Sequence, residues 1–189
     1  PSHGPSMAAA LMRGFAAVRG SAGGKAFRIR IVDVYGVKAT TTTFDVANGI
    51  YLAVNAGGNP INLSLGTSAD SAFLHHVIQQ ASAQGVIFFA AAGNEPVTAP
   101  TFPAAYPEVV AVTAGVHGQI DSYANRGGFV DTMAPGSSLV CYGGQAWNVQ
   151  GTSAASAFAS GVASGAAAMG GPSGQVASVT TNALLSTER

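Results

Sequence analysis

The chain has 189 residues, and its eight Lys and Arg balance eight Asp and Glu, so its formal net charge is zero. This balance gives no indication of a nucleic-acid partner or of an anionic membrane surface. Hydrophobic residues make up 48% and charged residues 8%, which predicts one domain with a substantial core. A single cysteine, Cys141, excludes an intrachain disulfide framework, and no apolar run approaches the roughly 18 residues of a membrane span.

Helical and extended patterns alternate in the first third of the chain. Apolar side chains recur with helical spacing after Pro5, a residue type that suits the first turn of a helix. Residues 27–35 are rich in β-branched side chains and predict a strand. A second helical pattern lies within residues 40–54, and the short apolar run at residues 60–65 predicts another strand.

The alternation continues toward the C-terminus. Residues 69–84 predict a helix ended by Gly85, and the apolar run at residues 86–92 is typical of a parallel strand buried on both faces. Further predicted elements are strands at residues 109–113 and 133–140 and a closing helix at residues 178–186. This order predicts a doubly wound α/β fold, with a mostly parallel sheet, helices on both faces and sites at the carboxyl ends of the strands.

Gly151, Thr152 and Ser153 precede a run of small residues that extends to Ala168. Because this run has almost no bulk or charge, it predicts a buried helix that is touched closely on several sides. A serine in the first turn has its own backbone N–H and the positive end of the helix dipole beside its hydroxyl, which suits a nucleophile. The alternative is an ordinary helix N-cap, where Ser and Thr are common.

Small and polar residues follow two of the predicted strands. Asn94 comes just after a buried strand, where its amide is placed to donate to an oxyanion, and His3 at a helix start is a candidate general base. Accessible backbone suits capture of an extended peptide at Ser64, Leu65, Gly66, Ala91, Ala92 and Gly93. The ordinary alternatives are a turn residue for Asn94 and a solvated side chain for His3.

Six segments occur in one order along the chain: residues 3–8 (HGPSMA), 61–66 (INLSLG), 89–95 (FAAAGNE), 102–112 (FPAAYPEVVAV), 133–136 (MAPG) and 151–153 (GTS). In this order they resemble the subtilisin-like serine proteases, the subtilase family. The first resembles the family's histidine segment, the third its oxyanion-asparagine segment and the last its nucleophile. Residues 1–189 are therefore interpreted as a single partial peptidase domain that runs from the histidine segment to the C-terminal helix.

The resemblance implies a serine endopeptidase, a hydrolase that cleaves a polypeptide substrate through an acyl-enzyme on Ser153. It implies His3 as general base, Asn94 as oxyanion donor, and the residues beside the two strand ends as the substrate-binding cleft. It also implies a secreted or cell-envelope protein, although this chain contains no signal-peptide pattern. No nucleic-acid or membrane partner is expected.

The resemblance also exposes a missing group. In the family, the catalytic aspartate lies on a strand before the histidine segment, and here only Pro1 and Ser2 precede His3. Asp33 does not match the family order, so it is interpreted as a polar residue at the end of a strand. We expect the missing N-terminal part, including a central strand, in a longer precursor or on another chain. The chain alone should then be nearly inactive and should leave unpaired strand backbone.

Some residues depart from the family's pattern. Pro5 and Ser6 replace Thr and His, Pro96 replaces a glycine, and Ala157 replaces a proline four residues after the nucleophile. No acidic loop follows the histidine helix, so no cofactor is evident and calcium is expected only by the resemblance. The uncharged cleft predicts apolar P1 side chains, with Thr101 narrowing the pocket.

Other functions are open in different degrees. The departures at Pro5 and Ala157 leave a catalytically impaired subtilase-fold protein that binds peptides as the main alternative. A different hydrolase or a nucleotide-binding domain is disfavoured, because Ser153 lacks a Gly-x-Ser-x-Gly frame and no Gly-rich loop follows the first strand. His75 and His76 are adjacent on a helix and point in different directions, which disfavours a metal site, and His117 is predicted in a turn.

Overall fold

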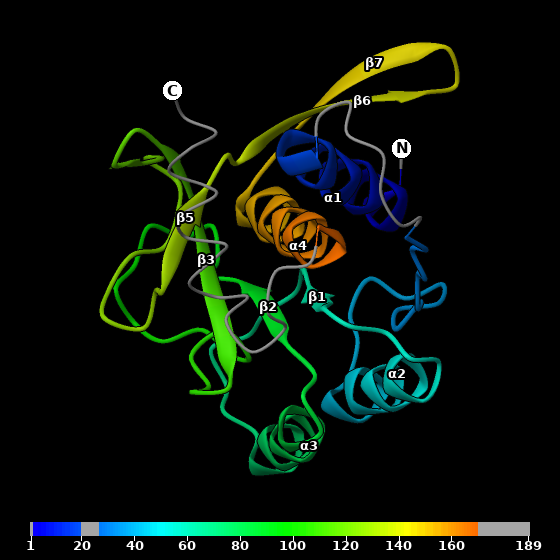
Figure 1. The fold of residues 1–189 in the computed structure, drawn as a ribbon. Helices are drawn as coiled ribbons and strands as arrows, with labels where there is room; N and C mark the ends of the chain where they lie inside the picture. Colours follow the sequence, from blue (N-terminus) through cyan, green and yellow to red (C-terminus); the bar gives the residue numbers. More distant parts are fainter. Residues whose placement is uncertain (1, 20–26, 170–189) are drawn as a thin grey trace.

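A mostly parallel sheet lies at the centre of the computed structural model, which describes residues 2–19 and 27–169. The parallel strands are, in spatial order, β1 (Ile61–Leu63), β2 (Phe88–Ala91), β3 (Val109–Val116) and β5 (Thr132–Ala134), and the short β4 (Gln119–Ile120) pairs with β3 in the antiparallel direction. The helices are α1 (His3–Arg19), α2 (Thr43–Asn55), α3 (Ala72–Ala83) and α4 (Thr152–Ala168). Figure 1 shows α1 and α4 on one side of the sheet and α2 and α3 on the other, which confirms the predicted α/β fold.

Strand β2 is buried on both faces because the sheet has a helical layer on each side. Phe88 packs in a cluster with side chains of α2 and α3, whereas its neighbour Phe89 packs in a second cluster with side chains of α4. Both aromatic side chains have no exposed surface. The continuous apolar run at residues 86–92 is thereby explained, since successive side chains of a strand point to opposite faces.

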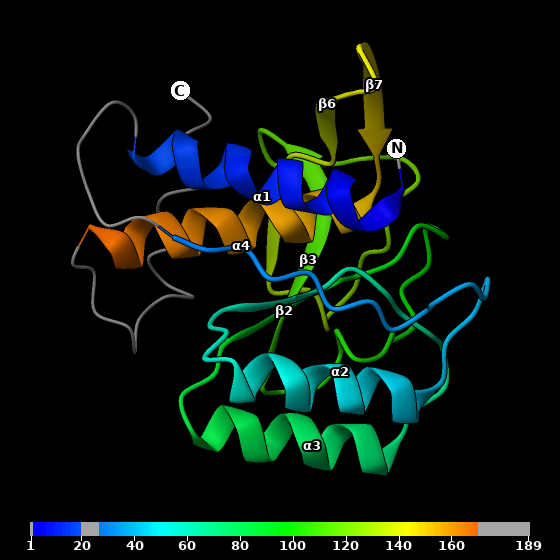
Figure 2. The ribbon, with the colours of Figure 1, turned by 90° about the vertical axis from the view of Figure 1, so that its right-hand side faces the viewer.

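Helices α1 and α4 lie side by side (Figure 2), and they pack so closely that their backbones are in contact. A Cβ atom on Gly161 would lie 1.9 Å from the Leu11 carbonyl oxygen, and one on Gly14 would lie 2.0 Å from the Phe158 carbonyl oxygen. Only glycine fits at these two contacts. In α4, every residue is buried except Ser153, Ser164, Ala167 and Ala168. The predicted buried helix of small residues is therefore confirmed.

The predicted helices form with slightly shifted ends. Helix α3 begins at Ala72 rather than residue 69, because the Ser71 hydroxyl caps it by accepting from the Leu74 N–H at 3.3 Å. Helix α2 is capped in the same way by Thr42, whose hydroxyl accepts from the Asp45 N–H at 3.1 Å. The helix predicted at residues 178–186 lies outside the described residues.

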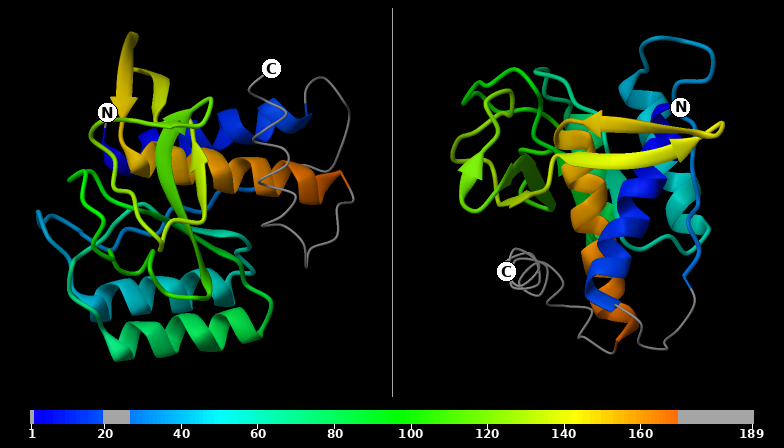
Figure 3. Two further views of the ribbon diagram at one scale, coloured as in Figure 1. Left: turned by 90° about the vertical axis from the view of Figure 1, so that its left-hand side faces the viewer. Right: turned by 90° about the horizontal axis from the view of Figure 1, so that it is seen from above.

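The single strand predicted at residues 133–140 is wrong. The chain forms two strands there, β5 and then β6 (Ser137–Tyr142), and β6 pairs with β7 (Gln145–Gln150) in an antiparallel hairpin. Pro135 and Gly136 lie between β5 and β6, and the Gly136 carbonyl accepts from the Gly151 N–H at 2.9 Å. A proline provides no N–H for a ladder, so the chain leaves the sheet here. The hairpin projects beside α1 (Figure 3).

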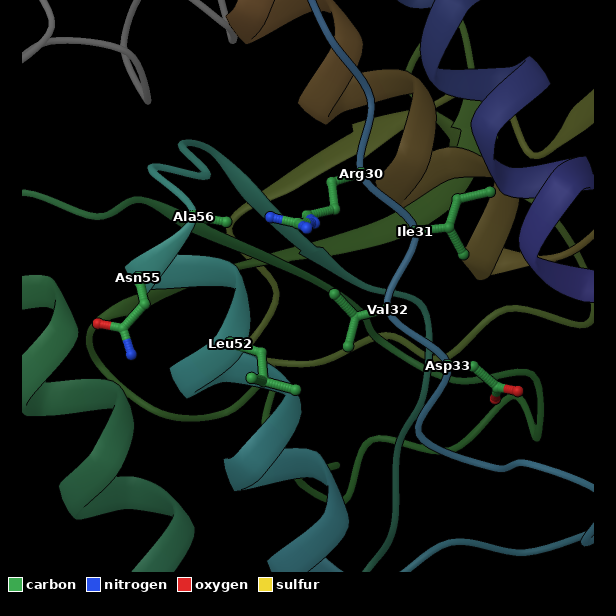
Figure 4. A pocket seen from close by; sticks show the side chains of 7 residues that line it. All are labelled: Arg30, Ile31, Val32, Asp33, Leu52, Asn55 and Ala56. Atoms are coloured by element: carbon green, nitrogen blue, oxygen red, sulfur yellow. The ribbon is translucent and has the colours of Figure 1, made fainter.

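The strand predicted at residues 27–35 is also wrong. Residues 27–33 belong to no strand, and Ile31 is 56% exposed despite its apolar side chain. In the described part of the chain, β1 pairs only with β2, so no described strand pairs with its other edge. A cavity of about 520 Å³ lies between this segment and the end of α2, lined by Val32 and Leu52 among others (Figure 4). Residues 27–33 therefore have strand composition but no strand to pair with.

Candidate active site

The first turns of α1 and α4 bring two of the predicted site residues together. The helices run parallel, since Leu11 meets Gly161 and Phe15 meets Gly165 further along both. The same register, extended back to the helix starts, places His3 opposite Ser153. The glycine contacts thus determine the approach of the candidate base to the candidate nucleophile.

His3 and Ser153 contact one backbone oxygen. The His3 Nε2 atom lies 3.1 Å from the Ser64 carbonyl oxygen, and the Ser153 hydroxyl donates to the same oxygen at 3.4 Å. The Ser64 hydroxyl in turn donates to the Ser153 carbonyl at 2.9 Å. No hydrogen bond joins His3 directly to Ser153 among the described residues. Proton transfer between them requires the imidazole to exchange the Ser64 carbonyl for the Ser153 hydroxyl.

Asn94 is oriented by Thr152, which is fully buried. The Oδ1 atom of Asn94 accepts from the Thr152 N–H at 2.9 Å and from the Thr152 hydroxyl at 3.0 Å. Thr152 Oγ1 also accepts from the Gly93 N–H at 3.1 Å, which holds the loop after β2 against the start of α4. Because both donors are on Oδ1, the amide nitrogen of Asn94 is left to donate elsewhere, beside the first turn of α4.

The helix N-cap of α4 is Gly151, which has a φ of 143° and no side chain to cap with. Ser153 therefore lies inside the helix, and its hydroxyl caps no backbone N–H in the described structure. Of the three residues Gly151, Thr152 and Ser153, the N-cap is therefore Gly151, and neither hydroxyl residue has the capping role that Ser and Thr commonly take. A positive φ at Gly151 also explains why the chain enters the helix through glycine.

The two segments predicted to bind substrate follow β1 and β2. Just after Gly66, Thr67 pairs with Phe102, and the two residues exchange backbone hydrogen bonds of 2.9 and 2.8 Å. A Cβ on Gly66 would lie 2.9 Å from the Thr101 methyl group, so Thr101 stands directly across from Gly66. Thr101 and Gly66 are thus in close contact, and a narrowing of the substrate pocket by Thr101 stays a prediction.

A family model described as the subtilase family matches residues 1–184. The chain belongs to the subtilase family. It is 34% identical over 146 residues to the thermophilic serine proteinase of Bacillus sp. (strain AK1), a match that covers 76% of this chain and 36% of that protein. It is also 34% identical over 142 residues to the subtilisin of Bacillus pumilus, covering 69% of this chain and 52% of that protein.

Solved structures show the same relationship. A cold adapted subtilisin-like serine proteinase superposes with a TM-score of 0.64 at 32% identity, covering 76% of this chain and 54% of that chain. The self-cleaved protease domain of PatA superposes with a TM-score of 0.64 at 30% identity, covering 76% of this chain and 64% of that chain. This subtilase chain spans between about a third and a half of the length of the two curated relatives named above.

Two departures from the subtilase pattern have clear places in the structure. Ala157 is fully buried and packs with Met7 and Ala10 of α1, where a small side chain admits the neighbouring helix. Pro5 lies in the exposed first turn of α1, where its missing N–H costs no helical hydrogen bond. Neither residue interrupts its helix.

No carboxylate contacts His3 in the described part of this subtilase. Asp33 instead accepts backbone N–H bonds from Tyr35 and Gly36, both at 2.9 Å, and these two bonds lower the pKa of its carboxyl. Asp33 therefore organises a turn and does not end a strand, because residues 27–33 form no strand.

Residues 2–19 and 27–169 contain no group of three His, Cys, Asp or Glu side chains placed to hold a metal ion, and no helix long and apolar enough to cross a bilayer. His75 pairs with Glu108 at 2.8 Å and stacks on Tyr106, which is a packing role. His117 has a φ of 53°, which confirms its place in a turn. Calcium binding stays a prediction.

A polar network beneath the site was not predicted from the sequence. Asn62, in the middle of β1, accepts from the Ser156 hydroxyl at 2.7 Å and donates to the Ser64 hydroxyl at 2.8 Å. Ser160, one turn after Ser156, also donates to Asn62 Oδ1 at 3.4 Å. This network holds the end of β1 against α4. Its sequence signal is a polar residue in an apolar strand and two serines four residues apart on a buried helix.

Proposed function

We propose that this chain is the part of a serine endopeptidase that carries the nucleophile, the general base and the oxyanion donor. Ser153 attacks a peptide carbonyl, and His3 takes the hydroxyl proton and passes it to the leaving amine. The backbone N–H of Ser153 and the amide nitrogen of Asn94 hold the oxyanion of the tetrahedral intermediate. Water then hydrolyses the acyl-enzyme on Ser153.

The orientation of Asn94 is the observation that carries this proposal. Thr152 places two donors on the Asn94 carbonyl oxygen, so the amide nitrogen is left to donate elsewhere, and it lies 3.4 Å from a Cβ built on Gly151, at the start of α4. A turn asparagine or a structural serine requires no such arrangement. An amide N–H left to donate beside a helix N-terminus is, however, what an oxyanion requires.

We further propose that a strand with a terminal aspartate completes the domain, either from the same polypeptide or from another chain. It inserts between β1 and residues 27–34 and orients His3. Support comes from the unpaired edge of β1 and from the apolar but exposed Ile31. Substrate is a polypeptide, which pairs with the backbone beside Leu65 and Ala92.

The test is a fusion of this chain behind the aspartate-bearing segment of the Bacillus pumilus subtilisin. Turnover of a chromogenic peptide and fluorophosphonate labelling are measured for the fusion, for the chain alone and for the fusion with that aspartate changed to Ala. We expect the fusion to exceed the Ala control by roughly 10⁴-fold, a magnitude transferred from related serine proteases. Ser153→Ala must abolish labelling.

A second candidate function is peptide binding without catalysis. The absence of a direct His3–Ser153 hydrogen bond in the described structure favours it. In that case the folded fusion binds an extended peptide in calorimetric titration but forms no fluorophosphonate adduct. A labelled Ser153 contradicts this alternative.

The cleft also supports a specificity. No charged side chain belongs to its predicted walls, and Thr101 narrows them opposite Gly66, so we expect uncharged, apolar P1 residues. A panel of P1 substrates tests this, and a preference for Lys or Arg contradicts it. We also expect secretion, because one relative, 42% identical over 81 residues, is named a minor extracellular protease.

A further inference from the structure

Asn125 lies outside all the segments discussed above, yet it is 2% exposed and uses every polar atom of its side chain. Its Nδ2 atom donates to the Ala92 carbonyl at 2.9 Å and to Thr101 Oγ1 at 3.1 Å. Its Oδ1 atom accepts from the Glu95 N–H at 2.8 Å. A backbone N–H can only donate and a carbonyl can only accept, so these contacts determine the orientation of the amide.

These bonds hold residues 92–95, the loop that carries Asn94 and is called the oxyanion loop below, around the side-chain amide of Asn125. Ala92 precedes Gly93 and Asn94, Glu95 follows them, and the backbone N–H of Asn125 donates to the Gly93 carbonyl at 2.9 Å. Gly93 has a φ of 113°, and a Cβ there would lie 2.4 Å from Asn125 Nδ2. The loop therefore has a glycine because its backbone touches this buried amide.

Asn94 is held from two sides, through its side chain and through the backbone on either side of it. Thr152 holds the Asn94 side chain from the α4 side, and Asn125 holds the backbone on both sides of Asn94 from the β2 side. Thr101, bonded to the same amide, reaches the far wall at Gly66. Among the described residues, no hydrogen bond joins Asn125 to Ser153 or to His3.

We infer that Asn125 is a positioning residue, which holds the backbone at Gly93 and Asn94 so that the Asn94 amide meets the oxyanion. This inference rests on the proposed function, because it assigns Asn125 a role through Asn94. Small displacements of a group that stabilises a transition state cost rate much more than they cost substrate binding. Losing Asn125 should therefore lower kcat and leave KM nearly unchanged.

A double-mutant cycle in the active fusion tests this role. We expect Asn125→Ala to lower kcat by about 10- to 100-fold with KM changed less than about 3-fold. Asn94→Ala should cost about 10²–10³-fold in kcat, a magnitude transferred from subtilisin. In the Asn94→Ala background, Asn125→Ala should cost less than about 3-fold more. If the loss of kcat in the double variant equals the product of the losses in the two single variants, the inference is overturned.

Asn59 provides a matched control at the other end of β2. Its amide donates to the Gly85 carbonyl at 2.9 Å and accepts from the Ile87 N–H at 3.1 Å, which is the same kind of backbone bridge. Asn59→Ala should lower the thermal midpoint without a change in kcat larger than about 2-fold. Equal losses of kcat in Asn59→Ala and Asn125→Ala would show that Asn125 only stabilises the fold and does not position Asn94.

Milder variants and a readout without turnover keep the test decisive. If Asn125→Ala does not fold, Asn125→Asp preserves the acceptor for Glu95 and removes the donor for Ala92, and it should show the same kcat loss. If the wild-type fusion shows no turnover, the proposed function fails. Hydrogen exchange of the Glu95 amide in the folded protein then reads the restraint alone. Exchange as slow in the Asn125 variant as in the wild type overturns the inference.

Discussion

The two flanks of the central sheet differ in how completely their strands are paired. On one flank, β3 is paired on both sides, and its residues Ala111 to Ala114 are at most 1% exposed. On the other, β1 has a single described neighbour, and residues 27–33 run nearby without joining a sheet. Both flanks have strand-like, apolar sequences. The comparison shows that such a sequence becomes a strand only where another strand satisfies its backbone groups.

The largest expected effect lies on the closed flank. Phe89→Ala removes a fully buried ring between β2 and α4 and should destabilise the fold by about 3–5 kcal/mol. Phe73→Ala, at a ring that is 52% exposed on α3, is the control and should cost far less. Urea unfolding measures both, and equal losses would remove the distinction between packed and open regions.

The contact between α1 and α4 should be the next most sensitive. Gly161→Ala brings a methyl group to 1.9 Å from the Leu11 carbonyl oxygen, so the helices must separate at a cost of about 1–3 kcal/mol. The same change moves His3 relative to Ser153 and should lower fluorophosphonate labelling in the fusion. Gly128→Ala, where a Cβ has nothing within 4 Å, should change neither. Retained stability and labelling in Gly161→Ala would show that the helix register does not position the site.

A smaller, pH-dependent effect belongs to Glu108, at the start of β3. Burial raises the pKa of its carboxyl, but hydrogen bonds, chiefly from His75, outweigh burial and hold the pKa below its usual 4.5. The charged form therefore stabilises the fold above about pH 4.5, and this contribution is lost as the pH falls through the lowered pKa. Glu108→Gln should cost less than about 1 kcal/mol at pH 7, and the difference from wild type should vanish in acid. A difference independent of pH between 7 and 3 would contradict this.

The smallest effect is expected on the open flank. Ile31→Ser should change the stability of the chain alone by no more than about 0.5 kcal/mol, because the side chain is 56% exposed. In the fusion, where we propose a strand beside it, the same change should cost about 1.5 kcal/mol or more. Equal costs in the two proteins would contradict insertion of a strand at this place.

Much of the candidate site follows from local sequence. Gly151, Ser153 and the small residues after them predict a buried helix with an early serine, and Gly93 with Asn94 predicts a polar turn after a buried strand. These features are local, since a helix period, a glycine and a short motif are read within a few residues. The partners of these residues are not local. Thr152 meets Asn94 from 58 residues away, and no pattern in either segment predicts the bond.

The sequence by itself determined the alternation of helices and strands and the six segments in subtilase order. Only the tertiary structure decided that residues 27–33 form no strand, because pairing depends on a neighbour and not on composition. It also brought Asn125, 30 positions after Glu95, into hydrogen-bond contact with the loop that carries Asn94. A buried amide acquires such contacts from the backbone groups that folding brings around it.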